Sequence, residues 1–364
     1  MTSEVQAAIA DLVEGRVLEP ERVGLALGEI MDGRSSDART AAFLVALRMR
    51  GESVPQLIAA AKALRARAVT ARVRDARVVD TCGTGGSGID TFNISTTAAF
   101  VVAGAGVAVA KHGNRSASSR SGSFDLLEAL GIEIELPIET CARILDEIGI
   151  AAFYARTAHP AFRHVASVRA ELGIRTFLNL LGPLLSPVEA RHQVVGVFAE
   201  PLVDRIAAVL AGLGAVRALV VHGEDGLDEL TTTAPNRAVL VRDGRTERIE
   251  IDARALGLPR AGLADLAGGS PAENAATTRS ILAGEPGPRR DIVLLNAAAA
   301  LFVAQAVGSL AEGIERAARS IDEGAAAGRL EALRVATQAA AAADPARAGE
   351  RSRAHSTPGE VRLA

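Results

Sequence analysis

Two loops of this chain have the residue types that bind anions. The first loop, residues 83–93 (GTGGSGIDTFN), and the second loop, residues 111–123 (KHGNRSASSRSGS), each follow a short β-branched run and precede an apolar helical pattern. Glycine-rich backbone presents its N–H groups openly, and the helix behind each loop adds the positive end of its dipole. Two such loops predict one ligand that carries more than one phosphate.

The first loop also matches the pattern G-x-G-x-x-G at Gly83, Gly85 and Gly88. A dinucleotide-binding fold needs, in addition, an acidic residue at the end of the second strand. That strand instead ends in Lys111 and His112, which suit phosphate, and no G-K-[ST] follows. The sequence therefore argues against both a dinucleotide fold and an NTPase P-loop.

Hydroxyl groups follow the first loop at Ser95 and Thr96, which can cap a helix and still offer an oxygen to phosphate or Mg²⁺. They argue against the simpler alternative, a glycine-rich turn without a ligand. The second loop could be a solvated basic turn, but its neighbour makes a phosphate site the better hypothesis. Its side chains able to meet a sugar phosphate are Lys111, His112, Asn114 and Arg115.

A run from His159 to Thr176, HPAFRHVASVRAELGIRT, carries histidines and arginines. His159 and His164 are five residues apart, which does not stack them on one helix face, and no carboxylate completes a metal set. Arg169 and Arg175 could each meet a carboxylate through the two-pronged guanidinium. The alternative for each arginine is an ordinary surface position.

Two adjacent carboxylates, Asp228 and Glu229, lie in the turn DGLDE that follows the apolar run 218–221. A turn after a strand lies at the edge of the sheet where ligands collect in open α/β folds. Hard carboxylates there suit Mg²⁺, which is commonly shared with substrate phosphates. A solvated acidic turn is the alternative.

Composition limits the classes of partner. Across 364 residues, 49% hydrophobic content fills a core, and the net charge of −3 with mixed signs predicts neither a nucleic-acid nor an anionic-membrane partner. Cys82 and Cys141 are too few for a disulfide framework and fit a reducing cytoplasm. The start of the chain is an amphipathic helix rather than a signal peptide, and the longest apolar run, 98–110, is too short to span a membrane. We expect a soluble cytoplasmic protein.

The period of the hydrophobic pattern changes along the chain, and this change indicates which helices and strands position these residues. Residues 1–72 are predicted to be helical, as is the stretch 160–190. Strands alternate with helical patterns and indicate an α/β fold with a mostly parallel sheet. The predicted strands are 77–80, 107–110, 218–221, 239–241 and 249–251, and the polar tail beyond about 345 is predicted to be disordered.

Taken as a set, the motifs GTGG, TFNIST, KHGNRS, HPA…VR…LG.RT..N.LGPL and DGLDE closely resemble the anthranilate phosphoribosyltransferases, from the N-terminal helices to about residue 340. These enzymes of tryptophan biosynthesis join anthranilate to phosphoribosyl pyrophosphate (PRPP). The resemblance implies a small all-helical domain (1–72 with about 165–190) and a larger α/β domain (73–164 with about 191–345) with a hinge between them. It also implies a homodimer formed through the helical domain and a tail over 346–364.

The resemblance further implies roles for residues at matching positions. PRPP would bind at Gly83, Gly85, Gly86, Thr91, Asn93, Ser95, Thr96, Lys111 and Ser123. Anthranilate would lie between the domains near Gly83, Asn114, His112, His159, Arg169 and Pro183, with its carboxylate on Arg169. One or two Mg²⁺ ions would be held by Ser95, Asp228 and Glu229. No residue is implied to be a strong acid or base.

Three positions depart from the family pattern. Ser87 stands where the glycine loop usually has Asp, Tyr154-Ala155-Arg156 replaces F-A-P, and Ser186 replaces a common Asn. The first change removes a carboxylate near the pyrophosphate, and Arg156 adds a cation near the proposed acceptor entrance. Either the acceptor differs somewhat from anthranilate or these positions tolerate variation; we favour tolerance.

Other functions compete with this hypothesis. A paralogue could ribosylate a different aromatic amino acid, and a nucleoside phosphorylase of related fold is a further possibility. A phosphorylase, however, binds no pyrophosphate, so Asp228 and Glu229 would have no pyrophosphate-bound Mg²⁺ to hold. A non-catalytic, nucleic-acid-binding relative should show a basic face, which the net charge of −3 argues against.

Overall fold

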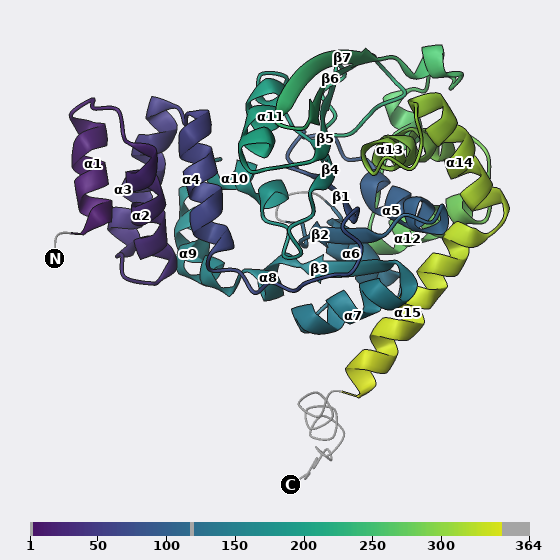
Figure 1. Ribbon diagram of the computed structural model, residues 1–364, viewed down its shortest axis with the longest axis horizontal. Coiled ribbons are helices and arrows are strands. Elements are labelled where there is room, and N and C mark those ends of the chain that lie inside the picture. Colours follow the sequence, from purple (N-terminus) through teal and green to yellow (C-terminus); the bar gives the residue numbers. More distant parts are fainter. Residues whose placement is uncertain (1–2, 117–119, 344–364) are drawn as a thin grey trace, which may run out of the picture.

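A helical domain lies beside a larger α/β domain in the computed structural model, which describes residues 3–116 and 120–343 (Figure 1). The helical domain consists of α1 (Glu4–Val13), α2 (Pro20–Met31), α3 (Asp37–Arg50) and α4 (Val54–Arg65), with α9 (Arg163–Leu172) and α10 (Leu178–Leu181) packed against them. The tail predicted to be disordered, 346–364, lies outside the described residues.

Local sequence explains where these helices begin and end. Ser53 and Gln56 form a capping box at the start of α4, where each side chain satisfies a backbone N–H of the other residue. Pro20 opens α2, since proline lacks the N–H that a first turn cannot use. Gly51 ends α3 at a φ of +77°, a conformation that favours glycine.

The α/β domain is built on a seven-stranded sheet with the order β3-β2-β1-β4-β5-β6-β7 among the described residues. Its strands are β1 (Val79–Gly83), β2 (Val109–Gly113), β3 (Ile150–Tyr154), β4 (His192–Gly196), β5 (Arg217–Gly223), β6 (Asn236–Arg242) and β7 (Arg245–Ile251). The first five strands run parallel, and β6 and β7 are antiparallel. The predicted mostly parallel sheet is therefore confirmed, while β3 and β4 were not among the predicted strands.

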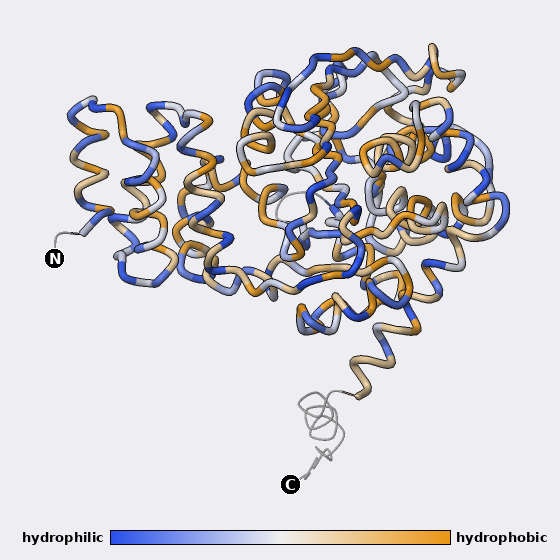
Figure 2. Tube along the Cα trace, viewed as in Figure 1, coloured by the Kyte–Doolittle hydropathy of each residue, from blue (hydrophilic) through white to orange (hydrophobic). Residues whose placement is uncertain are grey.

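The two faces of the sheet are covered by different parts of the chain. Leu219 and Val221 of β5 pack into a core with the helices of the α/β domain, whereas Ala218 and Val220 pack with the helical domain. Alternate residues of a strand point to opposite faces, so one strand serves both cores. Figure 2 shows the hydrophobic stretches running through the strands, while hydrophilic and hydrophobic stretches alternate along the N-terminal helices.

The remaining helices complete the α/β domain. They are α5 (Ile94–Gly104), α6 (Ser123–Ala129), α7 (Ile138–Ile148), α8 (Ala155–Ala158), α11 (Leu202–Gly212), α12 (Pro271–Leu282), α13 (Pro288–Val303), α14 (Leu310–Asp322) and α15 (Ala325–Ala342). Short 3-10 turns lie at Pro160–Phe162, Gly182–Leu184, Ala253–Leu256 and Leu263–Leu266. Over residues 3–116 and 120–343, no helix combines the length and apolarity needed to cross a membrane.

Candidate active site

Four neighbouring parallel strands end in glycine at one edge of the sheet. β1 ends at Gly83, β2 at Gly113, β4 at Gly196 and β5 at Gly223. The first loop follows β1 and the second loop continues from β2, while residues 224–229, which we call the acidic turn, follow β5. Three of the segments that the sequence singled out, the two loops and the acidic turn, therefore meet at the carboxyl edge, where open α/β sheets bind ligands.

The conformation of the first loop requires glycine. Gly85, Gly86 and Gly88 have φ angles of +66°, +84° and +79°, which residues with a Cβ rarely adopt. At the start of the loop, the N–H of Thr84 donates to the Gly196 carbonyl over 2.8 Å. This hydrogen bond anchors the start of the loop. The three glycines that follow are exposed, so the loop presents open backbone beyond that point.

The acidic turn lies directly against the ends of β1 and β4. A Cβ on Gly83 would be 3.0 Å from Asp228 Oδ2, and a Cβ on Gly196 would be 1.7 Å from the Asp228 carbonyl oxygen. Only glycine therefore allows this approach. Because Glu229 Oε1 accepts the N–H of Ser95 over 3.2 Å, the acidic turn also touches the first turn of α5. The structure thus brings together Ser95, Asp228 and Glu229.

This group has the chemistry of a magnesium site. Glu229 is partly exposed, but protein atoms surround its carboxylate. Desolvation by these atoms raises the pKa of Glu229 to about 7, and the negative charge of Asp228 contributes to the same shift. A cation between the two carboxylates would relieve that repulsion, and hard oxygens suit Mg²⁺. The described residues contain no group of three or more His, Cys, Asp or Glu able to hold a metal. A bound Mg²⁺ would therefore also need oxygens from water or from a substrate phosphate.

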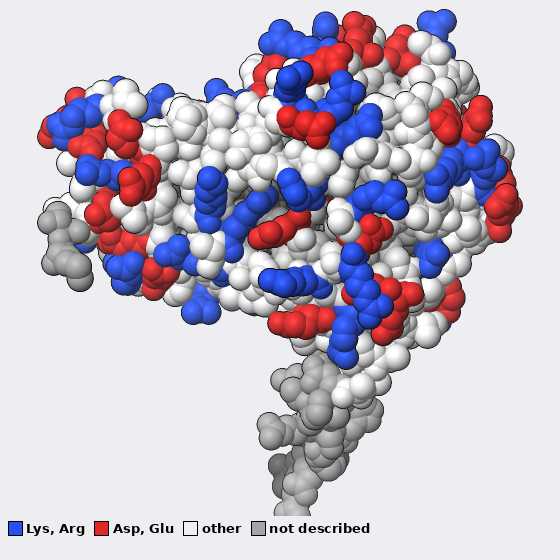
Figure 3. Space-filling model, viewed as in Figure 1, with Lys and Arg blue, Asp and Glu red and all other residues white. Residues whose placement is uncertain are grey.

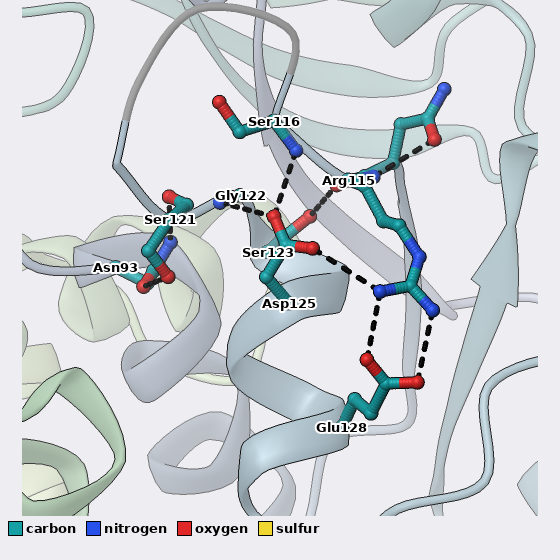
Figure 4. Close-up of polar contacts among 9 residues, drawn as sticks. Asn93, Arg115, Ser116, Ser121, Gly122, Ser123, Asp125 and Glu128 are labelled. Carbon is teal, nitrogen blue, oxygen red and sulfur yellow. Dashed lines mark hydrogen bonds and ion pairs between the residues drawn. The ribbon is translucent and has the colours of Figure 1, made fainter. Parts of the chain in front are cut away.

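Asp125 holds the two sides of the second loop together (Figure 4). Its Oδ2 accepts the N–H groups of Ser116 and Gly122 over 2.9 and 2.8 Å. Arg115 makes a two-pronged contact with Glu128, at 2.7 and 2.9 Å. The prediction that Arg115 meets a sugar phosphate stays a prediction; in this structure its guanidinium pairs with Glu128 of α6.

Asn93 joins the first loop to the second. Its Nδ2 donates to the Ser121 carbonyl over 3.1 Å, and its Oδ1 accepts from Ser121 Oγ and from Asn274 Nδ2 over 3.2 and 3.0 Å. Asn93 is also the N-cap of α5. The expectation that Ser95 or Thr96 caps this helix is wrong, because both lie inside its first turn.

The other residues implied for PRPP lie along the same edge at different depths. Lys111, in the middle of β2, is buried, and its Nζ donates to the carbonyl of Thr81 in β1. Thr91 pairs with Ala267 in an isolated bridge. Ser123 begins α6 and its Oγ donates to the Asn114 carbonyl over 3.2 Å, which places both residues at the mouth of the second loop.

Two buried histidines face each other beside this edge. The rings of His112 and His159 are 5.2 Å apart, centroid to centroid, and the Nε2 atom of each has no hydrogen-bond partner in the described part of the chain. Burial lowers the pKa of His112 to about 3 and that of His159 to about 4, so both rings are neutral near pH 7. Nearby, the carbonyl of Pro183 accepts from Gln193 Nε2 over 2.8 Å.

Arg169 and Arg175, the two arginines that could meet a carboxylate, have different surroundings. Arg169 is half-buried, and within residues 3–116 and 120–343 its side chain makes neither a hydrogen bond nor an ion pair. Burial alone lowers its pKa. Arg175 instead donates to the carbonyl of Gly86 and lies over the ring of Phe198 at 4.3 Å. Arg169 therefore remains the arginine available to a carboxylate.

Two residues that shape the site, Asp125 and Asn274, were not predicted from the sequence. Asp125 had a signal, since an acidic residue three positions after Gly122 is the spacing of a helix cap. No sequence signal pointed to Asn274, because it lies on α12, 181 residues from the Asn93 that it contacts.

Comparisons with known proteins agree with this arrangement. Residues 6–68 match the family described as "Glycosyl transferase family, helical bundle domain", and residues 75–327 match "Glycosyl transferase family, a/b domain". The chain is 52% identical, over 333 residues, to an anthranilate phosphoribosyltransferase of Anaeromyxobacter dehalogenans; the match covers 92% of this chain and 98% of that protein.

Solved structures give the same result. The anthranilate phosphoribosyltransferase of Thermus thermophilus superposes with a TM-score of 0.87 at 45% identity, covering 93% of this chain and all of that one. The Saccharomyces cerevisiae enzyme in complex with PRPP and Mg superposes with a TM-score of 0.85 at 27% identity, covering 93% of this chain and 99% of that one.

Proposed function

Because this chain belongs to the anthranilate phosphoribosyltransferase family, we propose that the carboxyl edge of its sheet is where it works on both substrates. The chain is an enzyme of tryptophan biosynthesis. It transfers the phosphoribosyl group of PRPP to the amine of anthranilate and releases pyrophosphate. One observation supports the assignment of the site: the two loops and the acidic turn converge on one edge of the sheet.

PRPP binds along the first and second loops in this proposal. The exposed N–H groups of the first loop receive the pyrophosphate at Gly83, Gly85 and Gly86. Lys111 supplies a positive charge beneath them. The hydroxyl and amide groups at the same edge complete the phosphate contacts: Thr91, Asn93, Ser95, Thr96 and Ser123.

Asp228 and Glu229, with the hydroxyl of Ser95, hold Mg²⁺ in this proposal. The raised pKa of Glu229 and the closeness of Asp228 to Gly83 support a cation here, and the yeast relative was solved with PRPP and Mg. When bound, the ion would neutralise charge on the departing pyrophosphate. One or two Mg²⁺ ions bind in this proposal, and titration calorimetry with Mg²⁺ in the presence of PRPP measures the number.

Anthranilate binds beside His112, His159 and Pro183 in this proposal, close to Gly83 and Asn114, with its carboxylate on Arg169. The unpaired guanidinium of Arg169 supports this orientation, since two-pronged contacts to carboxylates are strong. The neutral histidines support it too, because they place no positive charge beside the amine or beside the ribose carbon as its own charge grows.

The chemistry needs little from acids or bases. An aromatic amine has a free lone pair at neutral pH, so it can attack C1 of the ribose without prior deprotonation. The C1–N bond forms as the C1–O bond to pyrophosphate breaks, and the nitrogen then gives up one proton to the released pyrophosphate or to water. The first-loop N–H groups and Lys111 stabilise the negative charge that leaves, and the walls of the site keep water from C1.

We further propose a homodimer formed through the helical domain and a cytoplasmic location. Val13, Val17 and Met49 expose 73%, 85% and 82% of their surface on that domain, which supports an apolar contact with a second copy. The free thiols of Cys82 and Cys141 support a reducing compartment.

Loss of anthranilate fluorescence in the presence of PRPP and Mg²⁺ tests the function directly. We expect the purified chain to consume anthranilate, and the double variant Asp228→Asn, Glu229→Gln to lose turnover at low Mg²⁺ while its circular dichroism stays unchanged. Asp225→Asn, in the same turn, tests whether any lost carboxylate has this effect. No decay with the wild-type chain at millimolar PRPP, across a range of Mg²⁺, would refute the activity; wild-type rates in the double variant would refute the metal site.

A further inference from the structure

Arg175 connects the helical domain to the first loop. It lies between α9 and α10, and its Nη2 donates to the carbonyl oxygen of Gly86. The centre of its guanidinium lies 4.3 Å from the centroid of the Phe198 ring. No ion pair engages Arg175 in the part of the chain that the structure describes. The guanidinium is therefore committed to one backbone carbonyl and one aromatic ring.

Phe198 ties this contact to the sheet. It follows β4, and its N–H donates to Thr84 Oγ1 over 3.2 Å, while the N–H of Thr84 donates to the Gly196 carbonyl over 2.8 Å. The residue that supports Arg175 therefore also anchors the start of the first loop. Stacking on an aromatic face orients a planar guanidinium and favours its hydrogen bonds.

The hydrogen bond to the Gly86 carbonyl also orients the N–H of the next residue, Ser87. In a trans peptide the C=O of one residue and the N–H of the next point in opposite directions, and the structure has no cis peptide among its described residues. Holding the Gly86 carbonyl toward Arg175 therefore turns the N–H of Ser87 to the other side of the loop. Without this bond, the glycines at 85, 86 and 88 could rotate freely, since glycine adopts either sign of φ.

We propose that Arg175 is a positioning residue that sets the first loop in the conformation needed for pyrophosphate before PRPP binds. The proposal rests on the PRPP site proposed above. It assigns to the helical domain a direct influence on the phosphate loop, since Arg175 precedes α10 of that domain. Binding to a loop already in place costs less conformational entropy than binding to a mobile one.

Hydrogen–deuterium exchange without any substrate tests the positioning. We expect the peptide that spans residues 84–89 to exchange faster in Arg175→Ala and in Phe198→Leu than in the wild type. Arg163→Ala removes an exposed arginine of α9 and serves as the matched control. Unchanged exchange in Arg175→Ala would overturn the proposal, because a residue that only touches substrate would give that result.

Steady-state kinetics supply the second measurement. We expect Arg175→Ala to raise KM for PRPP about tenfold, as the loss of one charged hydrogen bond predicts, with KM for anthranilate within about twofold of the wild type. Added guanidinium ion should restore part of the PRPP affinity, and the double variant with Phe198→Leu should be no worse than Arg175→Ala alone. A larger effect on anthranilate than on PRPP would overturn the proposal. If the wild type itself consumes no anthranilate, the exchange result still decides the role of Arg175.

Discussion

At the scale of single residues, several unusual side chains have local partners that explain them. Tyr154 stacks on Phe124 with ring centroids 5.0 Å apart, and Ser186 Oγ accepts the N–H of Ala190 over 3.3 Å. Ser87 Oγ accepts the N–H of Ile89 over 3.4 Å within the first loop. These contacts support tolerance of variation at the three departures from the family pattern, while nothing in the structure explains Arg156.

Arg169 gives the sharpest prediction about the acceptor. Because its guanidinium is unpaired and half-buried, Arg169→Ala should remove a charged contact to the anthranilate carboxylate. We expect KM for anthranilate to rise about 10- to 100-fold, with KM for PRPP nearly unchanged. Arg163→Ala, on the exposed side of the same helix, is the control. Equal weakening of both substrates would show that Arg169 acts elsewhere.

The buried histidines predict how stability depends on pH. The folded chain keeps His159 neutral down to about pH 4, whereas the unfolded chain protonates it near 6.5. The unfolded state therefore binds more protons between these values, so the stabilisation is complete above pH 7 and is lost as the pH falls toward 4. Each such histidine should account for about 2 kcal/mol of the free energy of unfolding lost between pH 7 and pH 5.

Urea unfolding at the two pH values checks this effect. The loss of stability between pH 7 and pH 5 should be about 2 kcal/mol smaller in His159→Asn than in the wild type. His164→Asn, a partly exposed position on α9, should leave the loss unchanged. An equal loss in the wild type and in His159→Asn would show that His159 is not held neutral.

At the scale of elements, the second loop depends on one carboxylate at the start of α6. Asp125→Ala would leave the N–H groups of Ser116 and Gly122 without that acceptor, and Arg115 without one of its carboxylates. We expect a loss of about 2–3 kcal/mol in the free energy of unfolding, together with a higher KM for PRPP. Asp265→Ala is a matched control, since Asp265 accepts a single capping N–H from Gly262 over 2.9 Å. A change in the free energy of unfolding without any change in KM for PRPP would show that the second loop is not part of the PRPP site.

The elements also show what the sequence could and could not predict. β1, β2, β5, β6 and β7 were predicted because β-branched runs stand between turn residues. β3 was missed because only Gly149 separates α7 from it, and β4 because five residues after an irregular stretch carry little pattern.

The same limit applies to the site. The motifs predicted which segments meet, because strand ends converge at one edge. They did not predict the pairing of Arg115 with Glu128 or of Arg175 with Gly86. Those contacts depend on side-chain directions across elements, which spacing along the chain does not encode.

At the scale of the whole molecule, the helical domain is packed onto the α/β domain rather than merely linked to it. Its core continues into α11 and one face of the sheet, and the buried Glu52 before α4 lies 3.8 Å from Arg205 of α11. The chain also crosses between the domains at Val69, whose N–H donates to the Ala158 carbonyl over 2.8 Å. A hinge between the domains stays a prediction, and these contacts are what its motion would have to preserve or break. On the face shown in Figure 3, basic and acidic side chains are interspersed.

The exposed apolar residues of the helical domain give the prediction for assembly. Arg50 at the end of α3 donates to the Leu12 carbonyl of α1 over 3.0 Å, so the ends of the two helices that carry Met49 and Val13 are joined. We expect Val17→Asp combined with Met49→Asp to convert the proposed homodimer to a monomer in sedimentation velocity, because charges would replace the apolar contact. Both side chains are exposed, so the free energy of unfolding of the monomer should change by less than about 1 kcal/mol. Val335→Asp, at an exposed apolar position of α15, should leave the dimer intact. A wild-type chain that sediments as a monomer at micromolar concentration, or a double variant that stays dimeric, would contradict assembly through this surface.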